Sequence, residues 1–240
     1  MNLIIDIGNN SAKYYIFSDT GIILHGRRPN SSYSFVQEFV TSYGIESIII
    51  SSVIDIPANE RDIIDRSCPK VVWFNSNTPI PLNIDYKTPH TLGSDRLAAA
   101  IGAMYEAPAK NLLIIDAGTA ITVDFVDAER NFKGGNISPG IKMRLRALHE
   151  FTGRLPLIEK EGPVPSLGYD TETAIRSGVI NGICQEIDGY INKIKEIFPD
   201  VLIFLTGGDE KTLINNIKSR IFADRFLVAK GLNHILEYIR

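Results

Sequence analysis

Two short turns in the sequence each carry an aspartate, one apolar or small residue and a glycine. Asp6 and Gly8 form the first turn, and Asp116 and Gly118 form the second. A glycine lets the backbone approach a phosphate closely and present N–H groups to it. A carboxylate beside it can hold a hydrated Mg²⁺ that also contacts phosphate oxygens. Together, the turns predict a clamp for the β- and γ-phosphates of a nucleotide.

Other common phosphate and metal motifs are absent from the sequence. It contains neither GxxxxGK[ST] nor GxGxxG followed by a helix. The two cysteines, Cys68 and Cys184, lie far apart, and the four histidines show no metal-ligand spacing. A disulfide framework and a thiolate zinc site are therefore not expected, and reduced thiols are.

The composition narrows the class of protein. The 240 residues are 44% hydrophobic and carry a formal net charge of −3, which provides no general basic field for a nucleic acid. The N-terminus has no basic leader, and no apolar stretch approaches the roughly 20 residues that span a bilayer. We expect a soluble cytoplasmic protein that binds neither nucleic acid nor membrane. The one basic cluster, at residues 142–146, is interpreted as a solvated helix face.

The sequence around the first turn recurs in the second half of the chain. Residues 3–17 read LIIDIGNNSAKYYIF, and residues 113–126 read LIIDAGTAITVDFV. Two unrelated hairpins could share ordinary turn chemistry. The matched run of four positions followed by the glycine favours two copies of one fold unit instead.

The remaining apolar runs alternate between predicted strands and helices. Strands are expected at residues 48–53, 71–74 and 201–205, and helices at residues 34–43, 59–67, 95–107 and about 171–198. This alternation favours an α/β fold with a mixed sheet in each half. We place the boundary near residue 108, giving an N-terminal half of residues 1–108 and a C-terminal half of residues 109–240 around a shared cleft.

The expected long helix has one apolar face, because its apolar residues recur at steps of three or four. This stripe is either core within one half or part of a surface that a second copy covers. Gly178 and Gly182, one helical turn apart, would suit a close helix approach in such a dimer.

Several motifs together resemble those of the type III pantothenate kinases. Residues 6–9 (DIGN) and 116–120 (DAGTA) resemble the first and second phosphate motifs of that family. Residues 86–96 (YKTPHTLGSDR) resemble its segment with a Tyr, a Pro and Gly-x-Asp-Arg. Further similar motifs, in family order, are GGNISPG at 134–140, Leu155-Pro156, GYDT at 168–171 and Thr206-Gly207-Gly208. The resemblance covers the chain from residue 3 to about residue 208.

This resemblance implies a fold and an activity. The fold would be α/β, with two similar actin-like (ribonuclease H-like) halves around a central nucleotide cleft, as in the acetate and sugar kinase/Hsp70/actin superfamily. The activity would be ATP-dependent phosphorylation of pantothenate to 4′-phosphopantothenate, the first step of coenzyme A biosynthesis. It also implies Mg²⁺, a monovalent cation (K⁺ or NH₄⁺) and a homodimer with the pantothenate site near the subunit interface.

The resemblance also assigns roles to individual residues. Asp95 is the candidate base for the pantothenate hydroxyl, Asp116 the candidate ligand of the monovalent cation, and Asp6 the candidate water-mediated ligand of Mg²⁺. ATP would be held by Asp6, Ile7, Gly8, Asn9, Asn10, Ser11, Ala12, Lys13 and Thr119. Pantothenate would be held by Tyr86, Gly93, Ser94, Asp95, Arg96 and Thr171.

Some positions depart from the family pattern or allow a structural role. Asn10 stands where the family usually has Thr, and Asp170 stands where Asn is usual, unless Asp170 faces away as a helix cap. Thr171 could also be only a helix cap, and Arg96 a surface ion-pair partner. The 206–208 turn could be an ordinary strand-to-helix connection.

Asp95 itself allows both kinds of reading. It precedes a run of strong helix formers, so it should lie at or just before a helix N-terminus, where it could act only as a cap. Two rival functions also remain open: another small-molecule kinase or phosphohydrolase of the superfamily, and a non-catalytic regulator that retains the fold.

Overall fold

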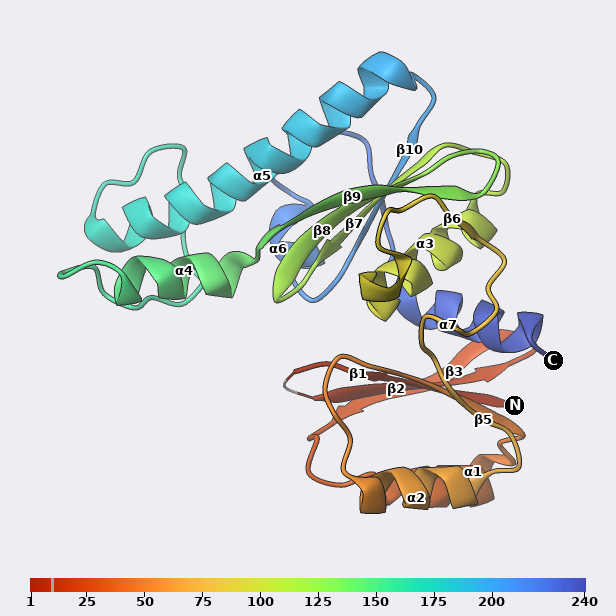
Figure 1. Cartoon of the computed structure of the whole chain (residues 1–240). Coiled ribbons are helices and arrows are strands. Elements are labelled where there is room, and N and C mark those ends of the chain that lie inside the picture. Colours follow the sequence, from red (N-terminus) through yellow and green to blue (C-terminus); the bar gives the residue numbers. More distant parts are fainter. Residues whose placement is uncertain (10) are drawn as a thin grey trace. The chain divides into compact units, whose positions relative to one another are not determined.

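The structure is a computed structural model that describes residues 1–9 and 11–240. It divides into two compact units (Figure 1). The first comprises residues 1–106 together with 226–240, and the second comprises residues 107–225. The first break falls two residues before the expected boundary at residue 108.

The sheet of the first unit has the strand order β3-β2-β1-β4-β5. Its strands are β1 (Asn2–Ile7), β2 (Ala12–Ser18), β3 (Gly21–Arg28), β4 (Ser47–Ser52) and β5 (Val71–Trp73). The β1–β2 and β2–β3 pairs are antiparallel, whereas β1–β4 and β4–β5 are parallel. Every residue of β1 is buried, as expected of a central strand covered on both faces.

Helices α1 (Phe35–Tyr43) and α2 (Ala58–Ser67) contribute to the core on one face of this sheet. Two short elements, β6 (Asn83–Ile84) and the 3-10 helix η1 (Pro89–Thr91), lead to α3 (Ser94–Glu106). The expected strands at 48–53 and 71–74 and the expected helices at 34–43, 59–67 and 95–107 therefore all have counterparts, within about two residues.

The C-terminal helix α7 (Leu227–Tyr238) belongs to the first unit by its packing. It lies against α3, β1 and β4. Glycines on both helices allow α3 and α7 to approach closely. A Cβ added at Gly102 on α3 would lie 2.2 Å from the Leu227 carbonyl oxygen. A Cβ added at Gly231 on α7 would lie 1.8 Å from the Ala98 carbonyl oxygen. The sequence-based division assigns residues 226–240 to the C-terminal half, so this packing differs from the expectation.

The second unit repeats the strand order of the first, as β9-β8-β7-β10-β11. Its strands are β7 (Leu112–Ala117), β8 (Ala120–Val126), β9 (Asn131–Pro139), β10 (Leu202–Thr206) and β11 (Phe222–Ala223). Again the hairpin strands pair antiparallel, and β7–β10 and β10–β11 pair parallel. The shared order and directions support the interpretation that the chain contains two copies of one fold unit.

Helices α4 (Ile141–Glu150), α5 (Thr171–Ile197) and α6 (Glu210–Leu213) complete the second unit (Figure 1). The apolar stripe of α5 is core: Ile175, Val179, Ile183, Ile187 and Ile191 are buried in the same cluster as residues of β7, β8 and β10. The structure therefore supports the intramolecular reading of this stripe. An added Cβ at Gly178 or Gly182 would meet nothing within 4 Å, so neither glycine serves helix packing within the chain.

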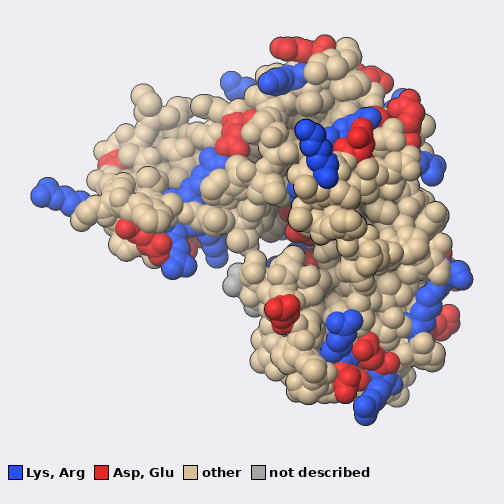
Figure 2. All heavy atoms as spheres, viewed as in Figure 1, with Lys and Arg blue, Asp and Glu red and all other residues tan. Residues whose placement is uncertain are grey.

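Charged residues of both signs are distributed over the surface. Figure 2 shows Lys and Arg side chains lying among Asp and Glu side chains on the visible face. No helix in residues 1–9 and 11–240 combines the length and apolarity needed to cross a membrane.

Candidate active site

The first phosphate turn begins where β1 ends. Asp6 is largely buried, and its Oδ2 lies 3.0 Å from the ammonium of Lys13 on the paired strand β2. The Gly8 N–H donates to the Ser11 carbonyl at 3.1 Å, and the Asn30 amide donates to the Gly8 carbonyl at 2.9 Å. The turn is thus held from both sides and presents a lysine beside the carboxylate.

The other described residues assigned to this turn lie at the end of β1, in the connection between the strands, or at the start of β2. Ile7 and Ala12 are buried and face each other in the β1–β2 register, while Asn9 is exposed and Ser11 is half-buried. Asn10 lies outside the described residues, so its role remains a prediction.

Asp95 is the second residue of α3. Its Oδ1 accepts a hydrogen bond from the Arg96 N–H at 2.8 Å. An added Cβ at Gly93 would lie 2.6 Å from the same oxygen, so glycine at this position leaves room for the carboxylate. The position at a helix N-terminus confirms the structural expectation for Asp95.

Ser51 connects the Asp95 segment to the first phosphate turn. Ser51 is the partner of Asp6 in the parallel β1–β4 register, and its hydroxyl oxygen lies 2.8 Å from that of Ser94. Because Ser94 directly precedes Asp95, this contact holds the start of α3 next to the strand that carries Asp6. The first unit therefore brings together two motifs that are almost 90 residues apart in sequence.

The rest of the 86–96 segment approaches the same helix. Tyr86 is half-buried in the connection between β6 and η1. Arg96 is 5% exposed, which contradicts the alternative of a surface ion-pair partner. Its side chain is therefore buried at the α3 N-terminus rather than a solvated surface charge.

The second phosphate turn follows β7 and lies against the end of β10. Asp116 is the register partner of Thr206, as Asp6 is of Ser51. Gly207 has φ +100°, a conformation that favours glycine, and an added Cβ there would lie 2.4 Å from Asp116 Oδ1. The 206–208 turn is thus more than a strand-to-helix connection, because its backbone packs directly on the Asp116 carboxylate.

The carbonyl of Thr119 accepts from the Gly140 N–H at 3.0 Å, where β9 leads into α4. Arg144 on α4 donates to the Pro139 carbonyl and pairs with Glu186 on α5 at 2.7 Å, and Glu186 also accepts from Ser138 at 2.6 Å. Burial alone would raise the pKa of Glu186, but the hydrogen bonds from Ser138 and Arg144 outweigh it and lower that pKa.

This network corrects one expectation about the basic cluster at residues 142–146. Arg146 is a solvated helix residue paired with Glu150, as expected for the cluster as a whole. Arg144 is different, because its guanidinium bridges α4, β9 and α5 and supports the backbone next to Thr119.

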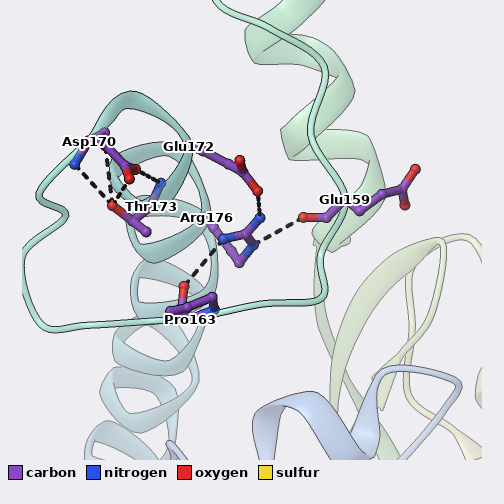
Figure 3. Close-up of polar contacts among 6 residues, drawn as sticks. All are labelled: Glu159, Pro163, Asp170, Glu172, Thr173 and Arg176. Carbon is purple, nitrogen blue, oxygen red and sulfur yellow. Dashed lines mark hydrogen bonds and ion pairs between the residues drawn. The ribbon is translucent and has the colours of Figure 1, made fainter.

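Asp170, and not Thr171, caps α5. The Asp170 carboxylate accepts from the Thr173 N–H at 2.7 Å, and the Thr173 hydroxyl reaches back to the Asp170 N–H at 3.1 Å (Figure 3). Hydrogen bonds from the Thr173 backbone and side chain lower the pKa of Asp170. The alternative that Thr171 is only a helix cap is therefore wrong. Thr171 is the exposed first residue of α5, and its contact with pantothenate remains a prediction.

Comparison with known proteins decides the family. A family model described as type III pantothenate kinase matches residues 2–193. A type III pantothenate kinase from Bacteroides fragilis is 49% identical over 238 residues, which cover 99% of this chain and 98% of the relative. The chain belongs to the type III pantothenate kinase family.

Solved structures with low identity support the fold of this kinase family member. A conserved protein of the Baf family of transcriptional activators from Campylobacter jejuni matches with a TM-score of 0.65 and 22% identity, covering 99% of this chain and 98% of that chain. A glucokinase from an Antarctic psychrotroph matches with a TM-score of 0.54 and 11% identity over 99% and 98% of the two chains. The predicted actin-like α/β fold, with two similar halves, and the predicted kinase family are confirmed.

The kinase's first turn has a donor set that fits a hydrated Mg²⁺. Lys13 donates to Asp6 Oδ2 at 3.0 Å, and Oδ1 is the carboxylate oxygen that would accept from a water of the hydrated ion. Magnesium retains most of its waters and takes one or two carboxylates together with phosphate oxygens. No group of three or more His, Cys, Asp or Glu residues suited to a metal occurs in the described chain.

The second turn of the kinase fits a monovalent cation. The Gly207 backbone approaches the turn so closely that an added Cβ would lie 2.4 Å from Asp116 Oδ1 and 2.3 Å from the Ala117 carbonyl oxygen, so a carboxylate oxygen and a carbonyl oxygen lie near each other there. Oxygen ligands of this kind suit hard cations.

Three supporting residues of the kinase site were not predicted from sequence. Asn30 holds the first turn, Ser51 holds the start of α3, and Glu186 supports the Thr119 turn. The only sequence signal for Ser51 is its position at the end of a strand next to the strand that carries Asp6. Asn30 and Glu186 reach the site from distant elements without a motif.

Proposed function

We propose that this chain transfers the γ-phosphate of ATP to pantothenate and forms 4′-phosphopantothenate, the first step of coenzyme A biosynthesis. The family membership supports this activity. The single structural observation that supports it best is the Ser51–Ser94 hydrogen bond, which joins the Asp6 phosphate turn to the Asp95 segment within one unit. A kinase needs its phosphate-binding turn next to its acceptor-binding segment, because the acceptor hydroxyl must attack the γ-phosphate in line.

Different residues would bind the phosphates, position the acceptor hydroxyl and hold the rest of pantothenate. Backbone N–H groups of the first turn and the Lys13 ammonium would bind phosphate oxygens. Asp95, at the N-terminus of α3, would accept a hydrogen bond from the pantothenate hydroxyl and aim it. Gly93, Ser94, Arg96, Tyr86 and Thr171 would hold the rest of pantothenate, and Thr119 would contact ATP.

Two cations would complete the charge balance. Mg²⁺ held through water at Asp6 would neutralise charge on the phosphates, and K⁺ or NH₄⁺ near Asp116 would offset the carboxylate that otherwise repels ATP. The Ala117 carbonyl oxygen that lies near Asp116 Oδ1 at the Gly207 turn supports the second assignment.

A homodimer is also proposed. Several apolar side chains are exposed on the second unit, on α4, α5 and the connection between them: Met143, Phe151, Leu157, Leu167, Tyr169 and Ile197. Phe151 and Leu167 are 85% and 86% exposed, which is costly for large apolar groups unless another surface covers them. Light scattering should give about twice the 26.6 kDa chain mass, and a chain mass at micromolar concentration would refute the dimer.

A coupled assay tests the activity directly. Wild-type protein with ATP, Mg²⁺ and K⁺ should release ADP only when pantothenate is present. Glucose and acetate in place of pantothenate test the alternative of another small-molecule kinase. ADP release with either of these but not with pantothenate would reject the proposal, and no release with any acceptor would favour a non-catalytic regulator.

A further inference from the structure

The connection between α4 and α5 is tied to α5 by one buried arginine. Arg176 is 2% exposed, and its guanidinium donates to the Glu159 carbonyl at 3.1 Å and to the Pro163 carbonyl at 3.4 Å (Figure 3). It also pairs with the exposed carboxylate of Glu172. The backbone on both sides of residues 160–162 is therefore fixed to the first turns of α5.

Gly162 fits against this arginine. It has φ +127°, and an added Cβ would lie 2.9 Å from the Arg176 guanidinium carbon. The chain thus turns tightly over the guanidinium, two residues after Lys160.

Lys160 points from this segment to the nucleotide-side turn. Its ammonium pairs with the carboxylate of Asp209, and both side chains are mostly buried, at 17% and 12% exposed. Asp209 directly follows Gly207-Gly208, and its N–H donates to the Ala117 carbonyl at 2.9 Å. Ala117 lies in the second phosphate turn, next to Asp116.

These contacts form a continuous path within the second unit. It runs from Arg176 near the α5 N-terminus, through Lys160 and Asp209, to the turn at Asp116–Gly118. The path joins the helix start that carries Thr171 to the turn assigned to the nucleotide.

We propose that Lys160 is a positioning residue for nucleotide binding: it neutralises Asp209 and holds the 206–209 turn on the second phosphate turn. This inference rests on the proposed function, since it assumes that ATP phosphates approach the second turn. The buried carboxylate of Asp209 would repel that polyphosphate if Lys160 did not compensate its charge. A salt bridge that served stability alone would not produce such a sign-dependent effect on ATP.

Four variants test this role. Lys160→Gln leaves Asp209 unpaired, Lys160→Arg keeps the charge, and Lys160→Gln combined with Asp209→Asn removes both charges. Arg146→Gln is the matched control, because it breaks the exposed ion pair with Glu150 on the surface of α4. KM for ATP, KM for pantothenate, kcat and the melting temperature are measured for each variant.

Lys160→Gln should raise KM for ATP roughly 10- to 100-fold, because the unpaired Asp209 carboxylate would repel the phosphates and interactions of charged groups are worth about 1.5–3 kcal/mol. KM for pantothenate should stay within about twofold. Lys160→Arg and the double variant should each recover most of the loss, although the double variant still lacks the ion pair. Arg146→Gln should match the wild type.

Three results would overturn the proposal. An unchanged KM for ATP in Lys160→Gln, or equal increases in both KM values, would assign the pair to general stability. A double variant that binds ATP no better than Lys160→Gln would show that the unpaired Asp209 charge is not the cause. If Lys160→Gln failed to fold, Lys160→Met, which also leaves Asp209 unpaired but keeps an unbranched apolar side chain, would take its place, and an ordinary ATP KM in that variant would leave only a structural role.

Failure of the proposed function would be recognised separately. If the wild type did not phosphorylate pantothenate, the same variants would be titrated with a non-hydrolysable ATP analogue. Weaker analogue binding in Lys160→Gln with recovery in the double variant would still support the role of Lys160, and uniform binding would reject it.

Discussion

The hydroxyl oxygens of Ser51 and Ser94 lie 2.8 Å apart, one at the end of β4 and the other at the start of α3. The pair is the direct link between the strand beside Asp6 and the helix that carries Asp95. A positional error in this link would move the acceptor-binding segment relative to the phosphate turn, and misplacement of about 1 Å can cost a hundredfold in rate.

Replacing either serine by alanine should therefore lower turnover more than stability. We expect kcat to fall roughly 10- to 100-fold, while the free energy of unfolding falls by about 0.5–1.5 kcal/mol. The double variant Ser51→Ala/Ser94→Ala should be little worse than either single variant, because both remove the same contact. Ser67→Ala, which removes a 2.6 Å hydrogen bond to the Ile64 carbonyl at the end of α2, is the control and should keep full turnover. Strictly additive losses would show that the serines act independently.

Asp95→Asn should separate catalysis from helix capping. The asparagine side-chain oxygen can still accept from the Arg96 N–H, so the melting temperature should change little. Turnover should nevertheless fall by roughly 10²–10⁴, because the amide cannot accept the proton and aims the hydroxyl poorly. Glu106→Gln at the other end of α3 is the control. A normal rate in Asp95→Asn would leave Asp95 with only a capping role.

Activity should require a monovalent cation that acts through Asp116. Turnover measured in K⁺ should exceed turnover in Tris with no small cation, since the Asp116 carboxylate would otherwise repel ATP. Asp116→Ala should lose most of the rate and also the response to K⁺. Equal wild-type rates in the two buffers would contradict this assignment.

Glu186 should contribute to stability in a pH-dependent way. Its folded-state pKa lies below the ordinary value of 4.5, because the hydrogen bonds from Ser138 and Arg144 outweigh burial. A carboxyl with a lowered folded pKa stabilises the fold fully above its unfolded pKa, and this contribution is lost as the pH falls through the folded pKa. Glu186→Gln should therefore be less stable than the wild type at pH 7, and the difference should shrink below pH 4.5. Urea unfolding of the wild type and of Glu186→Gln at pH 7 and at a pH below 4.5 measures this difference in stability. A difference that does not change with pH would contradict the electrostatic explanation.

Gly162→Ala should destabilise the second unit. The change forces a side chain into φ +127° and towards the Arg176 guanidinium, at a cost of roughly 1–3 kcal/mol. Gly189→Ala on α5 is the matched control: it meets nothing within 4 Å and should stabilise by about 0.5–1 kcal/mol, because alanine favours a helix interior. Thermal melts compare the two variants, and equal shifts would show that Arg176 tolerates a displaced loop.

The sequence predicts where the strands of this fold lie better than it predicts which elements pack against one another. The run Leu3–Ile5 and its repeat at Leu113–Ile115 are apolar throughout, so their strand character and their burial follow from composition alone. The packing of α7 could not be predicted in the same way. An amphipathic helix indicates that one face is buried, but either of two similar sheets could cover it.

In the candidate site, too, residues in short motifs could be predicted from sequence, whereas residues that act through distant partners could not. Asp6, Gly93, Asp95 and Asp116 stand in short motifs whose chemistry is local, and they could be identified as candidates. Ser51 and Lys160 act through partners 43 and 49 residues away, and a single serine or lysine carries no sign of such a partner. Supporting residues therefore become visible only when the register of the strands is known.

The place of α7 at the end of the chain has a consequence for synthesis on the ribosome. Residues 1–106 emerge first, yet the faces of α3, β1 and β4 that α7 covers remain open until residues 226–240 have been made. The second unit is the continuous range of residues 107–225, so all of it has been made before α7. The part of the protein that begins first is thus the last to close, and the faces that α7 covers stay exposed to chaperones and proteases while the whole second unit is being made.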